Sequence, residues 1–99
     1  MSEAEGTFVY TISDNVIQKI AATAALQCKG VTAKKGKGIV VHRNGETLAV
    51  DVHIQAQYGL NLRTLALTVQ QHVAKAVQQM AAPKALAVHV TIEDLRLPE

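Results

Sequence analysis

The sequence is poor in several residue types, and each shortage narrows what the chain can be. Among 99 residues there is one cysteine, Cys28, and there are three aromatic residues, Phe8, Tyr10 and Tyr58. A lone cysteine cannot build a disulfide framework, which fits a reducing compartment. With so few aromatics, the hydrophobic core has to be built from Val, Ile, Leu and Ala.

The chain also lacks long hydrophobic runs and an apolar leader. No apolar stretch approaches the roughly 20 residues that a membrane span needs. The opening residues 1–6 (MSEAEG) are acidic and polar, unlike a signal peptide. We therefore expect a cytoplasmic protein that does not insert directly into a membrane.

What the chain does contain is enough apolar material for one domain. Hydrophobic residues make up 48% of the sequence, and the formal net charge is only +2. The length predicts a single domain at residues 7–95. Residues 1–6 are predicted to be a disordered tail and residues 96–99 a second short tail.

A hairpin followed by a long helix forms the centre of the predicted fold. Asn44-Gly45 between two apolar runs is a strong hairpin signal, because a type I′ turn needs positive φ at both central residues. A two-residue loop at this position predicts that Val41 faces Leu48. Apolar and polar residues alternate along the second strand, so one face is predicted to be buried and the other open.

Capping residues and helical spacing of apolar residues predict two helices. Ser13 and Asn61 are good N-caps, and Pro83 ends the second helix. The apolar stripe of that helix consists of Leu62, Leu65, Ala66, Val69, Val73, Ala76, Val77 and Met80. Strands at 7–11 and 85–95 complete a β-α-β-β-α-β order. The chain is therefore predicted to be an α+β two-layer sandwich, with two helices packed on one face of a mixed sheet.

Three histidines are the first candidates for chemistry. His42, His53 and His89 fall on the polar face of the sheet by strand parity, and Asp51 falls on the same face. Imidazole and carboxylate groups bind divalent metals, but this spacing matches no known ligand motif. We expect no metal site and interpret these residues as part of a solvated sheet face.

A basic segment before the hairpin turn is the second candidate. Lys34, Lys35, Lys37 and Arg43 lie in it, with glycines between them and no carboxylate. Lysines and backbone amides freed by glycines can hold phosphates, so a small nucleic-acid-binding domain is the alternative function. The segment is not a Walker A loop and has no aromatic neighbours for base stacking. We prefer a solvated loop whose lysines protect an edge strand.

Catalytic machinery does not stand out in the sequence. Ser13 is explained as a helix cap, and Cys28 lies on an apolar helical stripe without a neighbouring base. Glu93 and Asp94 are adjacent carboxylates, but neighbours on a strand are expected to point to opposite faces. We therefore predict a non-enzyme with no catalytic residues and no cofactor.

The uncovered face of the sheet is the remaining candidate. Packing both helices on one side leaves the other side open, and weakly polar patches of this kind can pair with another surface. The predicted interaction face consists of Val40, His42, Ala49, Asp51, His53, Ala87 and His89. We expect self-association or docking of a protein partner through this face.

Short segments spread over most of the chain form an ordered pattern. The first are GTFVYTIS at 6–13, VIQKIAATAA at 16–25 and KGV at 29–31. The later ones are VDVHIQAQYG at 50–59, VQQHV at 69–73, VQQM at 77–80 and VHVTI at 88–92. In this order they resemble the alkaline-shock-protein family of bacterial cytoplasmic proteins, also called the general-stress or envelope stress response family. The chain is little more than the family's core, and its central loop is shorter and more basic.

The resemblance implies a role in cell-envelope and alkaline stress and no catalytic residues. Some family members are held at the membrane by an integral-membrane partner instead of inserting themselves. The expected function is a non-enzymatic stress-response module that acts through protein–protein contacts. We expect a homo-oligomer, or a cytoplasmic protein held at the membrane surface by an anchored partner.

Overall fold

The computed structural model describes residues 10–98, which form two helices and three strands. In chain order these are α1 (Asp14–Leu26), β1 (Val31–Asn44), β2 (Thr47–Gln57), α2 (Leu62–Ala81) and β3 (Ala85–Arg96). The predicted tail at 1–6 and most of the predicted strand at 7–11 lie outside the described residues. Tyr10 and Thr11, the described part of that segment, are not in a strand.

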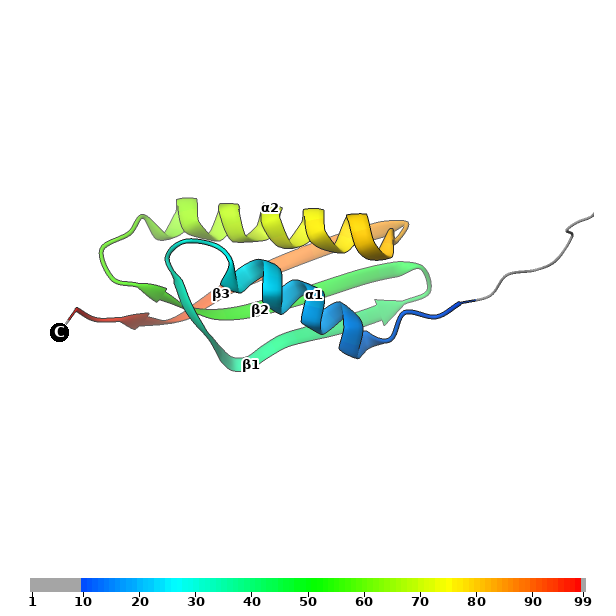
Figure 1. The fold of residues 1–99 in the computed structure, drawn as a ribbon, viewed down its shortest axis with the longest axis horizontal. Coiled ribbons are helices and arrows are strands. Elements are labelled where there is room, and N and C mark those ends of the chain that lie inside the picture. Colours follow the sequence, from blue (N-terminus) through cyan, green and yellow to red (C-terminus); the bar gives the residue numbers. More distant parts are fainter. Residues whose placement is uncertain (1–9, 99) are drawn as a thin grey trace, which may run out of the picture.

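The strands form one mixed sheet in the order β1-β2-β3. β1 and β2 are antiparallel, whereas β3 runs parallel to β2 and is reached through α2. Both helices lie on the same side of the sheet (Figure 1). The structure therefore confirms the predicted α+β sandwich of two helices on a mixed sheet. Within residues 10–98, no helix is long and apolar enough to cross a membrane.

The core lies between the helices and one face of the sheet. Along β2, every second residue is buried: Leu48, Val50, Val52, Ile54 and Ala56. The helices contribute fully buried side chains at Ile17, Ala21, Ala25, Val69, Val73 and Val77. Two residues assigned to the buried stripe of α2, Leu62 and Met80, are instead 37% and 65% exposed. They lie in the first and last turns of the helix, at its two ends.

Both predicted N-caps are present. The Ser13 hydroxyl accepts a hydrogen bond from the Val16 amide at 3.4 Å, and the Asn61 side chain accepts one from the Thr64 amide at 3.0 Å. Each cap satisfies one of the backbone amides that a helix start leaves without a partner. The starts of α1 and α2 are thus encoded locally, before any packing.

The hairpin turn lies one residue later than the sequence predicts. Asn44 pairs with Thr47, so the two central residues of the turn are Gly45 and Glu46. Gly45 has a φ of 63°, whereas Glu46 is not in the positive-φ region. This is the pattern of a type II′ turn, which takes glycine at its first central position, rather than of type I′.

The later turn shifts the strand register by two residues. Val41 pairs with Val50 rather than with Leu48. Because side chains alternate with a period of two along a strand, this shift leaves every residue on its predicted face. The wrong turn therefore did not change which residues are assigned to the core.

β1 is longer than predicted and is interrupted. It begins at Val31 and includes the basic segment that the sequence predicts as a solvated loop. The pairing with β2 breaks between Lys34 and Ile39. Gly36 and Gly38 lie in this bulge with φ values of 55° and 69°, which glycine adopts without steric cost.

Candidate interaction face

The strand register brings all seven residues of the predicted interaction face together on the side of the sheet opposite the helices. We call this surface the open face. Its rows across the strands are His42–Ala49–Ala87, then Val40–Asp51–His89, then His53–Thr91. Strand parity therefore placed these residues on one surface, and the strand order makes them neighbours.

Two of the three histidines of the open face each contact a carboxylate. Nε2 of His42 lies 3.4 Å from Oδ2 of Asp51, and Nδ1 of His53 contacts Oε2 of Glu93. Among the described residues, no three His, Cys, Asp or Glu side chains gather closely enough to hold a metal ion. The three histidines thus share a face without forming a common metal site.

A β-bulge in β3 supplies the carboxylate that His53 contacts. Ile54 pairs with Ile92, but the next residue of β2, Gln55, pairs with Asp94. Glu93 is therefore the extra residue of the bulge.

The bulge corrects the expectation that Glu93 and Asp94 point to opposite faces. Glu93 contacts His53, and Asp94 accepts a hydrogen bond from Nε2 of Gln55 at 3.1 Å. Both carboxylates therefore lie on the open face. The next residue, Leu95, returns to the helical side and packs against the core. Without the extra residue, strand alternation would place Leu95 on the open face.

A polar chain of contacts links the strands at the far end of the open face. The Thr32 hydroxyl donates to Oε1 of Gln55 at 2.8 Å, and Nζ of Lys35 lies 3.7 Å from Oδ2 of Asp94. The hydrogen bond from Gln55 lowers the pKa of Asp94, assisted by the Leu95 amide and the charge of Lys35. Asp94 therefore remains ionised further into the acid range than an ordinary aspartate.

The four residues of the predicted basic loop do not form one surface. Lys35 is paired with Asp94, and Nη2 of Arg43 lies 3.0 Å from Oδ1 of Asp14. Lys34 and Lys37 lie instead on the helical side, where they line a hollow of about 380 Å³ beside α1. Two of the four charges are thus offset by carboxylates, and Lys35 lies on the opposite side of the sheet from the other three.

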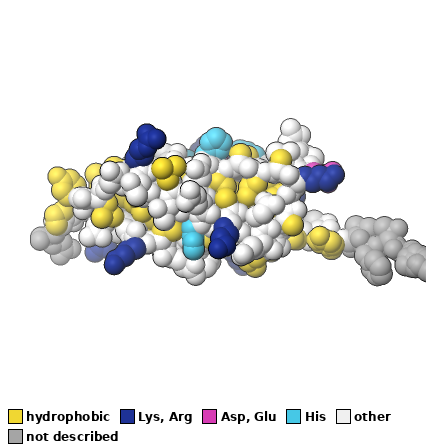
Figure 2. Space-filling model, turned by 90° about the horizontal axis from the view of Figure 1, so that it is seen from above, with side chains coloured by type: hydrophobic (Ala, Val, Ile, Leu, Met, Phe, Trp, Pro, Cys, Tyr) yellow, Lys and Arg dark blue, Asp and Glu magenta, His cyan; other side chains and the backbone are white. Residues whose placement is uncertain are grey.

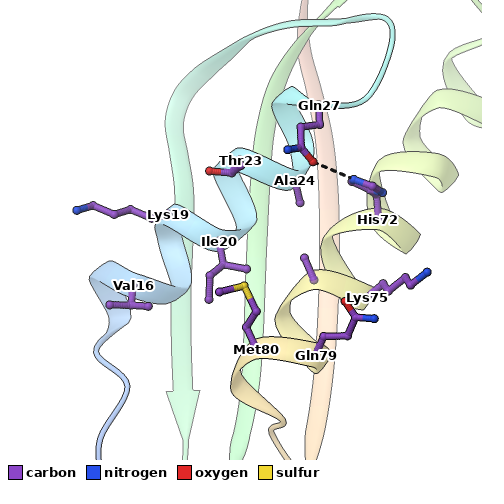
Figure 3. A pocket seen from close by; sticks show the side chains of 11 residues that line it. Val16, Lys19, Ile20, Thr23, Ala24, Gln27, His72, Lys75, Gln79 and Met80 are labelled. Carbon is purple, nitrogen blue, oxygen red and sulfur yellow. Dashed lines mark hydrogen bonds between the residues drawn. The ribbon is translucent and has the colours of Figure 1, made fainter.

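A larger hollow, with a volume of about 710 Å³, lies between α1 and α2 (Figure 3). We call it the helical groove. Its apolar lining consists of Val16, Ile20, Ala24, Ala76 and Met80, and its polar lining of Lys19, Thr23, Gln27, His72, Lys75 and Gln79. The sequence alone does not reveal this groove, because the groove depends on how the two helices lie side by side. The available signal was an apolar residue at the outer edge of each stripe, Val16 and Met80.

These features define a class of protein: a small α+β module with helices on one side of a mixed sheet and, within residues 10–98, no helix on the other. The chain belongs to the alkaline shock protein 23 family, whose described function is cell envelope-related, and the match covers residues 2–97. This confirms the resemblance seen in the sequence.

Two bacterial relatives match over most of their length. The uncharacterized protein Spy1535 of Streptococcus pyogenes is 26% identical over 98 residues, covering 85% of this chain and 76% of that protein. The uncharacterized protein YloU of Bacillus subtilis is 25% identical over 104 residues, covering 87% of each chain. Both are similar in size to this module.

Solved structures of the MamM CTD have the same fold. One variant superposes with a TM-score of 0.58 at 18% identity, covering 85% of this chain and 99% of that chain. A zinc form of another variant gives a TM-score of 0.56 at 16% identity, covering 86% of each. At such low identity, the likeness shows the α+β fold and nothing about ligands.

Proposed function

We propose that this protein is a non-enzymatic interaction module with a stress-related role at the cell envelope, and that it acts through the open face. One observation carries the proposal: on the face opposite the helices, the carboxylates of Asp51 and Glu93 each contact an imidazole, that of His42 and that of His53. Membership of a family with a cell envelope-related function supports the cellular role. The module needs no cofactor or metal for such a role.

The contacts made by these two carboxylates favour docking because they lower the cost of covering the face. An isolated charge is expensive to remove from water, whereas a paired and hydrogen-bonded charge is less so. Between the pairs lie the small or apolar side chains of Val40, Ala49 and Ala87. Small side chains allow another backbone to approach closely.

Self-association is the arrangement that we test first. A second copy would present the same face, so His42 and Asp51 of one copy would lie against a matching set in a two-fold arrangement. Docking of a membrane-anchored protein on the same face is the other form of the proposal. In that form the module would be cytoplasmic and peripheral to the membrane.

The test is to place two lysines in the middle of the open face. Ala49→Lys with Ala87→Lys introduces two unpaired charges on neighbouring strands and should abolish the oligomer, measured as molar mass by light scattering. The matched control is Gln71→Lys with Gln78→Lys, two exposed positions of α2, which should leave the mass unchanged. An oligomer of undiminished mass in the double open-face variant would contradict self-association.

A pull-down from source-cell lysate tests the partner form. A membrane protein retained by the wild type, with or without nuclease, and lost in the open-face variant would support docking. Retained material that disappears with nuclease would overturn the proposal and favour nucleic-acid binding instead. That outcome should also show affinity falling steeply with salt, because phosphate contacts release counterions.

A further inference from the structure

We propose that the helical groove binds an amphipathic helix of a partner protein, one whose apolar stripe is flanked by carboxylates. The groove lies on the helical side of the molecule, away from the open face. The proposal therefore goes beyond the function proposed above and stands or falls independently of it.

The shape and lining of the groove fit a docked helix. Ile20 and Ala24 are nearly buried at its floor, 9% and 3% exposed, whereas Val16 and Met80 remain 44% and 65% exposed. The side chains of Ile20 and Met80 point toward each other across one end (Figure 3). A furrow with an apolar floor between two helices is the surface that amphipathic helices occupy in helix-in-groove recognition.

The length of the groove sets the length of the helix. It runs along α1 from Val16 to Gln27, which is about 16 Å at a rise of about 1.5 Å per residue, or about three helical turns. At the Gln27 end, Oε1 of Gln27 lies 3.4 Å from Nε2 of His72 and joins the two helices with polar groups. The other end, beside Met80, is apolar and open to solvent.

The charge on this side of the molecule selects the partner's chemistry. α2 contains no carboxylate, and the single carboxylate of α1, Asp14, is bound by Arg43. Lys19 on α1 and Lys75 on α2 stand on opposite sides of the groove, and no Asp or Glu lines it among the described residues. Viewed from above α2, basic and histidine side chains lie among apolar ones (Figure 2). Carboxylates on both flanks of a docked helix would therefore meet a lysine without meeting a like charge.

The recessed floor favours a helix over a lipid surface. Anionic lipids would also attract Lys19 and Lys75, but a bilayer is flat on the scale of one helix. It would touch the exposed rim and leave Ile20 and Ala24 uncovered. A helix reaches the floor with its apolar stripe, so it buries more apolar area for the same electrostatic attraction.

The binding experiment uses two synthetic helical peptides of about 15 residues. Both carry leucines at helical spacing along one stripe; one has glutamates on the flanks and the other has lysines at the same positions. The glutamate peptide should bind the wild-type protein at least tenfold tighter in fluorescence anisotropy. Its NMR chemical-shift changes should map to residues such as Ile20, Thr23 and Ala76.

Two pairs of charge-reversal substitutions, one inside the groove and one outside it, test the role of the lysines. Lys19→Glu with Lys75→Glu should weaken binding of the glutamate peptide about tenfold or more, since two attractions become repulsions. Lys29→Glu with Arg63→Glu makes the same change in net charge at exposed positions outside the groove and should change the affinity less than twofold. The open-face variant Ala49→Lys with Ala87→Lys should bind the peptide with unchanged affinity.

Several results would overturn the proposal. These are equal affinity for the two peptides, no binding of the glutamate peptide, equal losses in both charge-reversal pairs, or shift changes that map to the open face. Binding to vesicles containing phosphatidylglycerol, lost on reversal of Lys19 and Lys75 and accompanied by no peptide binding, would assign this face to lipid instead. All variants are first shown to keep the wild-type circular dichroism spectrum and melting temperature.

Discussion

The guanidinium of Arg43 on β1 binds the carboxylate of Asp14 at the start of α1. Nε and Nη2 of Arg43 lie 3.2 and 3.0 Å from Oδ1 of Asp14. Nη2 also donates to the backbone carbonyl of Ile12 at 3.1 Å, just before the helix cap. One side chain of the sheet thereby fixes both the entry into α1 and the position of its first turn.

Removing this side chain should loosen the start of α1. Both partners are partly exposed to solvent, which screens the ion pair, so Arg43→Ala should lower the free energy of unfolding by only about 1 kcal/mol. Urea denaturation followed by circular dichroism measures the change. Lys37→Ala, in the same strand, is the control and should cost less than about 0.5 kcal/mol. Equal effects of the two substitutions would show that the Arg43 contacts do not stabilise the fold.

Alanine substitutions at Gly30 and Gly59 would distinguish the cost of backbone strain from the cost of steric crowding. Their φ values are 101° and 98°, so an alanine is strained at either position. A Cβ on Gly30 would lie 2.5 Å from Cδ1 of Leu60, whereas a Cβ on Gly59 would have no atom within 4 Å. Gly59→Ala should cost about 1–2 kcal/mol from strain, and Gly30→Ala about 1 kcal/mol or more beyond that. Equal urea midpoints for the two variants would mean that Leu60 moves aside without cost.

Asp94 should contribute to stability in a defined pH range. Its pKa is lowered, first by the hydrogen bond from Gln55, then by the Leu95 amide and by Lys35. A carboxyl whose pKa is lower in the folded than in the unfolded state stabilises the fold above the unfolded pKa. That contribution disappears as the pH falls through the folded pKa.

The cause of this shift can be tested in one substitution. Gln55→Ala should raise the pKa of Asp94 toward its ordinary value, as measured by NMR titration of the side-chain carboxyl carbon. Gln57→Ala, two residues along β2 and exposed, is the matched control and should leave the titration unchanged. An unaltered titration in Gln55→Ala would assign the shift to Lys35 and the backbone instead.

Cys28 should react slowly with alkylating reagents in the native protein. It is 8% exposed, its Sγ lies 3.5 Å from the Ala24 carbonyl, and burial raises the pKa of the thiol. A smaller thiolate fraction and restricted access both slow the reaction with iodoacetamide at pH 8. Urea should accelerate labelling as the protein unfolds. In a Cys28→Ser background, Thr23→Cys places an exposed thiol on α1, shortly before position 28, and should react rapidly without urea. Equally fast labelling at both positions would contradict the burial of Cys28.

Local signals in the sequence were sufficient to predict both helices and the strands β2 and β3. The caps Ser13 and Asn61 and the alternation of β2 depend on near neighbours, so they could be predicted without knowledge of the packing. The sequence predicts the turn one residue early. A two-residue loop at Asn44-Gly45 and one at Gly45-Glu46 both leave the same face of the hairpin buried. Only the backbone conformation distinguishes them, with positive φ at Gly45 alone.

Features that depend on packing could not be predicted from local signals in the sequence. The bulge at Glu93 exists because Leu95 belongs to the core, and an alternating pattern does not show where it will break. The helical groove requires α1 and α2 to lie side by side, which places Lys19 and Lys75, far apart in the sequence, on its opposite sides. For the open face, the alternation of side chains along each strand predicted which residues lie on the same side of the sheet. The strand order, which sets their neighbours, could not be fixed from the sequence.

The interrupted pairing of β1 has a consequence for the geometry of assembly. Edge strands with regular rows of free backbone groups recruit further strands and can grow into ribbons. The bulge between Lys34 and Ile39 breaks that row at one edge of the sheet. At the other edge, Nε2 of Gln70 donates to the Val88 carbonyl of β3 at 2.8 Å. With the row of backbone groups interrupted at these points, the self-association proposed above would use the open face and not the sheet edges, and a face-to-face pair would close after two copies.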